Sequence, residues 1–231
     1  LITTAFGLMI AVPGLVLHKY FEQKITYLLI SLQKDVSEFI NKIKRYLNLS
    51  GENEIEFFSE PKIDGLSISL NYFDGDLFQS LTRGDGEYGE DVTENIKRVK
   101  DIPHKLSGPY PKEIEIRGEV FIEKSDFIKM NEINQMIGEK VFSNPRNAAA
   151  GSIRQKNSKI TESRNLKFFA YAIGSSSERI ASKQSSLLER INGFGFRTNK
   201  LSLICKNLEE LIKNFNQIKE ARSNLEYDID G

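Results

Sequence analysis

A lysine beside a tight turn is the first residue of this sequence that could do covalent chemistry. Lys62 lies in the segment EPKIDG at residues 60–65, between an expected strand and an Asp-Gly turn, which can hold its side chain at the mouth of a pocket. A lysine is nucleophilic only as the neutral amine, so burial or neighbouring cations must lower its pKa. A phosphoramidate on that nitrogen would stay reactive, because the protonated nitrogen is a good leaving group. Taken alone, the pattern Lys-x-Asp-Gly is more often a solvated surface lysine beside a turn.

Longer motifs give this lysine a context. EPKIDG is similar to the adenylation motif that DNA ligases, RNA ligases and mRNA capping enzymes share as nucleotidyltransferases. The segments LTRGDGEYGEDVTENI, IRGEVFI, FSNPRNAAAGSIRQ and FFAYAIG follow in the order and at the spacing found in bacterial NAD-dependent DNA ligases. NPRNAAAGS is specific to that family and disfavours an ATP-dependent ligase. From about residue 31 to residue 231, the chain is therefore identified as a member of this family, within its adenylation domain.

The resemblance implies an enzyme whose catalytic residues are Lys62 and Asp64. Lys62 would attack the α-phosphate of NAD, release nicotinamide mononucleotide and carry AMP to the 5′-phosphate of a nick during DNA replication and repair. Glu60 would recognise adenine. Asp64 would position the lysine or a magnesium ion, although it could be only a turn-forming residue. The implied cofactors are NAD and Mg²⁺, and we expect no dedicated cluster of metal ligands.

The same resemblance assigns four further residues to the site. Arg83 and Glu119 match positions that contact the ribose and support the site. Arg146 and Arg154 match basic residues near the phosphate and the nicked DNA, and a guanidinium suits phosphate geometry. Ordinary salt bridges are the alternative for both arginines.

The local charge favours a DNA-binding face more than the overall charge does. The chain of 231 residues carries 32 cations and 32 anions. In the span from residue 146 to residue 167, however, only Glu162 opposes a run of cations, namely Arg146, Arg154, Lys156, Lys159, Arg164 and Lys167. This basic stretch could follow the backbone of nicked double-stranded DNA, or it could be a solvated loop. No obligate protein partner is inferred.

A second glycine motif looks like a nucleotide site and is rejected. Residues 84–89 (GDGEYG) spell G-x-G-x-x-G between an expected strand and an expected helix. Acidic side chains at positions 85, 87, 90 and 91 would crowd the place where a pyrophosphate must sit. We expect a glycine-rich turn with acidic helix capping instead.

The elements that must position these residues mix strands and helices irregularly. Strands are expected at residues 55–58, 66–73, 77–82, 114–121, 166–173 and 201–205, and helices at 35–47, 91–100, from Ser125 onward, 185–191 and 208–218. Asp74-Gly75 is a hairpin signal, Ser125 is the expected N-cap, and residues 175–177 form a serine-rich loop. This pattern predicts an α+β fold. The resemblance implies the DNA ligase/mRNA capping enzyme-type nucleotidyltransferase fold, with antiparallel sheets flanked by helices.

The single cysteine and the N-terminal segment bound the remaining possibilities. Cys205 is expected to pack in an apolar run, and one cysteine favours a reducing, cytoplasmic location. Residues 1–17 carry no charge. The length of this uncharged stretch is near the lower limit for a membrane span. The stretch LITTAFGLMIAVPGLVLHKYF resembles the last membrane helix of MotA/TolQ/ExbB proton-channel proteins, with Thr3 and Thr4 at positions where those helices are polar.

Two domains are therefore expected, residues 1–30 as an apolar N-terminal helix foreign to the domain and residues 31–231 as the adenylation domain. The first could give weak membrane association through residues 1–17, belong to a proton-channel-like fusion, or be a hydrophobic helix packed on the rest. Compared with the family, we expect this sequence to lack the module that grips the nicotinamide half of NAD and the phosphate-contacting lysine after YDIDG. We also expect it to lack the oligonucleotide-binding, zinc-finger, helix-hairpin-helix and BRCT regions. A truncated, inactive fragment that only binds adenylate or DNA is the main alternative.

Overall fold

The computed structural model describes residues 2–46, 55–84 and 88–230, with only the backbone described for 2–12, 29, 32 and 33. The chain divides into two compact units, residues 1–55 and residues 56–231. Each is described by itself.

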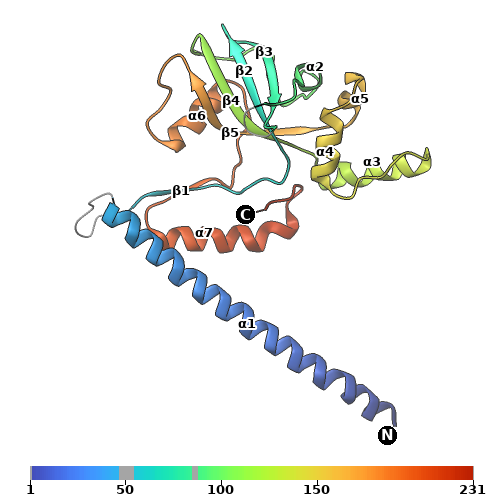
Figure 1. Cartoon of the computed structure of the whole chain (residues 1–231). Coiled ribbons are helices and arrows are strands. Elements are labelled where there is room, and N and C mark those ends of the chain that lie inside the picture. The colour runs from blue at the N-terminus through green and yellow to red at the C-terminus, as the bar shows by residue number, and fades with distance from the viewer. Residues whose placement is uncertain (1, 47–54, 85–87, 231) are drawn as a thin grey trace. The chain divides into compact units, whose positions relative to one another are not determined.

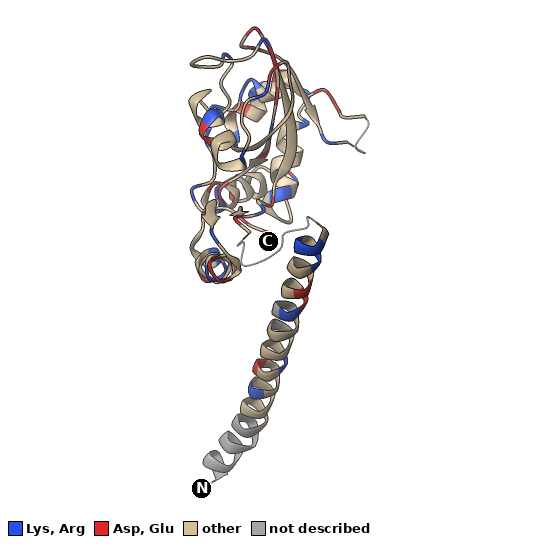
Figure 2. Ribbon diagram, turned by 90° about the vertical axis from the view of Figure 1, so that its left-hand side faces the viewer, with Lys and Arg blue, Asp and Glu red and all other residues tan. Residues whose placement is uncertain are grey.

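In the described part of the first unit, residues 2–46 form one long helix, α1 (Ile2–Tyr46), which continues through Pro13. It runs across the boundary expected at residue 30 and merges with the helix expected from residue 35. Lys, Arg, Asp and Glu residues occur along its described part (Figure 2), and Lys42 pairs with Glu38 at 3.1 Å. Among the described residues, no helix has an apolar stretch that could cross a membrane. Thr3 and Thr4 lie outside the described side chains.

The second unit is built on a four-stranded sheet in which all neighbours are antiparallel (Figure 1). The strand order is β3-β2-β4-β5, with bounds β2 (Leu66–Phe73), β3 (Asp76–Thr82), β4 (Glu113–Phe121) and β5 (Lys167–Ser176). The expected hairpin joins β2 to β3, where Asp74 and Gly75 have φ values of 47° and 82°. Both residues tolerate a positive φ, which a two-residue turn of this kind needs.

Alternating side chains from the sheet form the core of the second unit. Leu70 and Ile116 are fully buried, and Phe168 packs with them. The helices that cover and flank the sheet are α2 (Thr93–Ile96), α3 (Lys124–Met136), α4 (Pro145–Ile153), α5 (Ser158–Ser163) and α6 (Gln184–Gly193). Helix α6 packs against β5, and α4 packs against β2 and β4. Antiparallel sheets flanked by helices, as expected, are therefore present.

A smaller sheet supplies the chain segment that leads into the lysine. β1 (Phe57–Ser59) pairs antiparallel with β6 (Leu203–Cys205), and α7 (Leu208–Ala221) packs on both strands before the 3₁₀ helix η1 (Arg222–Asn224). Asn214 on α7 donates a hydrogen bond to Ser59 at 3.0 Å. Cys205 is buried here, so the expected packing role of this cysteine is confirmed.

Several expected elements were wrong in extent. The helix expected at residues 91–100 shortens to α2, because turns replace it after Ile96. Ser125 is not the N-cap of α3; Glu123 takes that position, and its side chain makes no capping bond. The serine-rich loop is partly strand, because Ser176 still pairs with Ile114 across a bulge. Helices α4 and α5 were not expected at all.

Candidate active site

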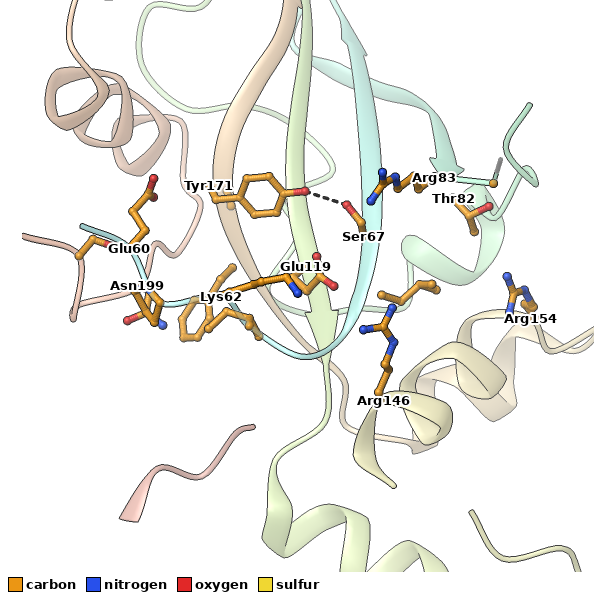
Figure 3. A pocket seen from close by; sticks show the side chains of 17 residues that line it. Glu60, Lys62, Ser67, Thr82, Arg83, Glu119, Arg146, Arg154, Tyr171 and Asn199 are labelled. Atoms are coloured by element: carbon orange, nitrogen blue, oxygen red, sulfur yellow. Dashed lines mark hydrogen bonds between the residues drawn. The ribbon is translucent and has the colours of Figure 1, made fainter. Parts of the chain in front are cut away.

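A cavity of about 740 Å³ lies in the second unit along the ends of β2, β4 and β5. It brings together six of the seven residues singled out from the sequence, which are Glu60, Lys62, Arg83, Glu119, Arg146 and Arg154. Asp64 does not line the cavity but hydrogen-bonds Arg146, which does. In Figure 3, Lys62 and Glu119 lie in the middle, Glu60 lies toward one end and the three arginines lie toward the other.

Lys62 lies in the loop between β1 and β2, and a tail from the far end of the chain fixes this loop. The backbone of Asp64 donates to the carbonyl of Asp228 at 2.9 Å, and the backbone of Asp230 donates to the carbonyl of Lys62 at 2.8 Å. The Lys62 ammonium forms an ion pair with the Asp230 carboxylate. This contact with Lys62 lowers the pKa of Asp230. The lysine is therefore held at the cavity with a counterion beside it.

The glycine of Lys-x-Asp-Gly is required by close packing. A Cβ on Gly65 would lie 2.3 Å from the carbonyl oxygen of Val120 and 2.9 Å from Cγ of Glu119. This close approach lets the Gly65 backbone N–H bond the Glu119 carboxylate. Burial nevertheless raises the pKa of Glu119 to about 7, although Arg146 and Lys62 act to lower it. A carboxyl group that titrates near neutrality thus lies beside the lysine.

Helix α4 delivers Arg146 from its first turn. Asn144 caps the helix by accepting the backbone N–H of Asn147 at 2.7 Å, and Pro145 occupies the first turn, where a proline is tolerated. Ala148 and Ala149 are fully buried, so the helix packs closely against the rest of the unit. NPRNAAAGS therefore encodes a capped, closely packed helix.

The arginine end of the cavity is rich in ion pairs. Arg146 donates to Asp64 at 2.9 Å, and this bond raises the pKa of Arg146. Arg154, the residue that ends α4, pairs with Glu90. Within residues 55–84 and 88–230, Arg83 makes no ion pair, whereas Arg146 and Arg154 each have a carboxylate partner.

The opposite end is built around the Glu60 carboxylate, and a pair of hydroxyl groups lies between this end and the arginines (Figure 3). Gln184 Nε2 donates to Glu60 at 3.2 Å and to the backbone carbonyl of Tyr171 at 2.9 Å. Burial raises the pKa of Glu60, and the Gln184 hydrogen bond opposes that rise. The Tyr171 hydroxyl lies 2.7 Å from Ser67 Oγ (Figure 3), and Asn199 completes this end of the lining.

The rest of the basic stretch is less uniform than its sequence. Lys156 and Lys159 are exposed, whereas Arg164 is partly buried and donates to Asn134 at 3.4 Å. The opposing Glu162 faces Arg98 at 3.8 Å instead of a cation of the stretch. Exposed cations thus continue beyond Arg154 along α5.

Sequence reasoning missed Asp230, Tyr171 and Gln184 as members of the site. Asp230 lies in YDIDG, the segment after which the family resemblance implies a phosphate-contacting lysine. Tyr171 lies in the motif FFAYAIG, and a tyrosine in an otherwise apolar strand was an available signal. Gln184 had no signal, because its neighbours in space come from β5 and from the loop before β2.

The rejected glycine motif forms a turn, as expected in the part that is described. Gly84 has a φ of 54°, and a Cβ there would lie 1.7 Å from the carbonyl oxygen of Tyr88. A Cβ on Gly89 would lie 1.9 Å from the carbonyl oxygen of Thr82. Asp91 accepts the backbone N–H of Thr93 at 3.0 Å at the start of α2. Gly86 lies outside the described residues.

The carboxylates near Lys62 suit a metal ion that arrives with a nucleotide. Mg²⁺ commonly takes one or two protein carboxylates together with phosphate oxygens and water. Across the described residues, no three His, Cys, Asp or Glu side chains cluster to hold a metal. Asp64 is 34% exposed and uses Oδ1 for Arg146, which leaves Oδ2 for a cation. The free oxygen of Asp64 therefore fits a Mg²⁺ ion that arrives bound to a nucleotide.

Comparison with known proteins assigns the family. Residues 29–231 match the model of the NAD-dependent DNA ligase adenylation domain. The chain is 49% identical over 199 residues to a DNA ligase of Roseobacter denitrificans and 48% identical over 198 residues to one of Nitrobacter winogradskyi. The alignments cover 86% and 85% of this chain, respectively, and 28% of each relative, so the chain spans less than a third of their length. This chain belongs to the family of NAD-dependent DNA ligase adenylation domains.

Proposed function

We propose that this chain performs the adenylation step of NAD-dependent DNA ligation. Lys62 Nζ attacks the α-phosphorus of NAD, the bond from that phosphorus to the bridging oxygen breaks, and nicotinamide mononucleotide leaves with the electron pair. The observation that carries the proposal is the position of Lys62 in the middle of a cavity that has a carboxylate at one end and three arginines at the other.

Each end of the cavity suits one part of the nucleotide. The Glu60 carboxylate can accept a hydrogen bond from the amino group of adenine, and the ring of Tyr171 offers an aromatic surface nearby. Arg83, Arg146 and Arg154 can neutralise phosphate charge as it shifts during the transfer. We assign Glu119 to the support of the ribose and of Lys62.

The lysine must lose a proton before it attacks. The Asp230 carboxylate holds the ammonium in the resting site, and an incoming phosphate would compete for that ammonium. Asp64 would hold a nucleotide-bound Mg²⁺, which supplies further charge neutralisation at the phosphates when present. Positioning and electrostatics then account for most of the rate enhancement.

Nicked double-stranded DNA is the proposed acceptor of AMP. Lys156 and Lys159, which follow Arg154 along the chain, are exposed. Exposed cations of this kind neutralise phosphates without regard to sequence. Sealing of the nick belongs to the whole enzyme of which the relatives are examples.

Binding without chemistry is the second candidate function. The ion pair between Lys62 and Asp230 favours it, because a paired ammonium is not a nucleophile. Three further possibilities stay predictions: membrane association through residues 1–17, a proton-channel-like fusion and a cytoplasmic location. Flotation of the chain with lipid vesicles tests the membrane association.

Intact mass of the full chain after incubation with NAD and Mg²⁺ separates the two candidates. We expect a gain of one AMP in the wild type and none in Lys62→Ala. Lys105→Ala, which removes an exposed lysine paired with Asp76 away from the cavity, serves as the matched control and should gain AMP. A folded wild-type chain that gains no AMP contradicts the adenylation proposal and leaves nucleotide binding.

A further inference from the structure

Gln184 is the feature that the proposed reaction leaves unexplained. It occupies the first position of α6 and does not line the cavity, yet both hydrogens of its side-chain amide are used. One goes to Glu60 Oε2 at 3.2 Å and the other to the carbonyl oxygen of Tyr171 at 2.9 Å. Gln184 therefore joins the loop that carries Glu60 to the strand that carries Tyr171.

The chemistry of the two partners fixes the orientation of this amide. A carboxylate and a backbone carbonyl are both acceptors, so only the NH₂ group of Gln184 can face them. The group that donates a hydrogen bond to Glu60, the amide of Gln184, is thus neutral. In the described part of the chain, Glu60 makes no ion pair. A neutral donor orients a carboxylate without cancelling its charge.

The orientation and charge of Glu60 decide which base it accepts. An ionised carboxylate only accepts hydrogen bonds, so it suits the exocyclic amino group of adenine and repels a base with an oxygen at that position. A protonated carboxyl group could instead donate to that oxygen. Burial favours protonation of Glu60 by raising its pKa, and the Gln184 hydrogen bond opposes this rise.

We propose that Gln184 is a positioning residue that keeps the Glu60 carboxylate aimed, and thereby sets the preference of the cavity for adenine nucleotides over hypoxanthine nucleotides. This inference rests on the proposed function, because it takes the Glu60 end as the base-binding end. It adds a determinant of base specificity that acts through Glu60 and does not touch the nucleotide.

The test compares adenylation of Lys62 by NAD with its modification by the hypoxanthine analogue of NAD. Single-turnover rates of the full chain are measured by intact mass at several concentrations of each dinucleotide. Gln184→Leu removes both hydrogen bonds at similar volume, and Gln184→Glu keeps the shape but presents an acceptor to Glu60. Ser185→Ala, in the same turn of α6, leaves both bonds in place and is the matched control.

For Gln184→Leu, we expect the half-saturating concentration of NAD to rise about tenfold while the maximal rate stays within about twofold. The preference for NAD over its hypoxanthine analogue should fall about tenfold. Gln184→Glu should lose at least as much preference, and Ser185→Ala should keep the wild-type values. An equal loss with both dinucleotides, or no loss, would overturn the proposal, because a purely structural role affects both substrates alike.

Equilibrium binding of AMP and IMP keeps this inference distinguishable from the reaction itself. If the wild-type chain binds AMP more tightly than IMP but forms no lysine adduct, the adenylation proposal fails. The specificity proposal is then tested by the ratio of AMP to IMP affinity, which should be lower in Gln184→Leu than in the wild type; an unchanged ratio would overturn it. If folded wild-type protein shows no preference for AMP over IMP, the role given to Gln184 is wrong.

Discussion

The two ends of the proposed nucleotide cavity differ in the partners that hold their charged side chains. At the arginine end, Arg146 and Arg154 are already paired with Asp64 and Glu90, and the side chains of all four are between 34% and 58% exposed. At the other end, a neutral amide holds Glu60. Under the proposed function, the first end would exchange partners when phosphates arrive, whereas the hydrogen bond at the second end is formed before any ligand enters.

This difference has a cause in solvation. Half-exposed ion pairs contribute little to stability because water screens them, so their exchange for phosphate costs little. Glu60 is also exposed, but its partner is the neutral amide of Gln184, which orients the carboxylate without cancelling its charge. Charge at one end is therefore available for the ligand, and geometry at the other end is fixed in advance.

The largest effect should come from Gly65, which packs against Val120 and Glu119 between the two ends. Gly65→Ala places a Cβ 2.3 Å from the backbone oxygen of Val120, which cannot move as a flexible side chain could. We expect a loss of about 3 kcal/mol of unfolding free energy in urea denaturation, together with loss of adenylation. Gly193→Ala, where nothing lies within 4 Å of the added Cβ, is the control and should stay within about 1 kcal/mol. Wild-type stability in Gly65→Ala would show that the strands can separate.

The partly buried carboxyl group of Glu119, between the two ends, gives a pH-dependent effect of similar size. The pKa of Glu119 is raised from 4.5 to about 7 by burial, so its contribution to stability is full below pH 4.5 and is lost as pH rises through about 7. Relative to the wild type, Glu119→Gln should gain about 3 kcal/mol of unfolding free energy between pH 4.5 and pH 8.

Glu115→Gln serves as a control of opposite sign for this measurement. Burial of Glu115 raises its pKa, but the hydrogen bonds from Arg117 and Ser69 outweigh burial and hold the pKa below 4.5. Its contribution to stability is therefore present above pH 4.5 and lost as pH falls. A stability difference between Glu119→Gln and the wild type that does not change with pH would contradict the raised pKa.

The arginine end can be tested without disturbing the fold. Arg146→Ala should lower the rate of Lys62 adenylation about hundredfold, because it removes a cation from the transferring phosphate. Its unfolding free energy should change by less than about 1 kcal/mol, because the pair with Asp64 is exposed. Arg98→Ala breaks an exposed pair with Glu162 away from the cavity and should leave the rate unchanged. Equal rates for the two variants would remove Arg146 from the site.

The smallest effect concerns the hydroxyl pair of Tyr171 and Ser67. Tyr171→Phe removes the 2.7 Å hydrogen bond to Ser67 and should cost about 1 kcal/mol of unfolding free energy. Tyr110→Phe is the control, because the Tyr110 hydroxyl makes no hydrogen bond within the described residues; it should change stability by less than about 0.5 kcal/mol. A larger loss in Tyr110→Phe than in Tyr171→Phe would contradict a stabilising role for this hydroxyl pair.

Much of the fold follows from local patterns in the sequence. The pattern of apolar residues predicted the bounds of strands β2, β3 and β4 to within about one residue. Asp74-Gly75 predicted the hairpin that joins β2 to β3. Helix α4 escaped detection because alanines and a glycine show no amphipathic period, and its stability comes from the Asn144 cap and from burial of Ala148 and Ala149. Packing with other elements decides such a helix.

The sequence by itself determined the chemistry that is available, namely a lysine in Lys-x-Asp-Gly, a carboxylate two residues before it and arginines farther along. Only the tertiary structure decided the partners: Asp230 is 168 residues from the lysine that it contacts, and Gln184 is 124 residues from Glu60. It also decided that Glu119 titrates near pH 7. The physical reason is that ion pairs and desolvation depend on neighbours in space, and these are set when distant segments pack together.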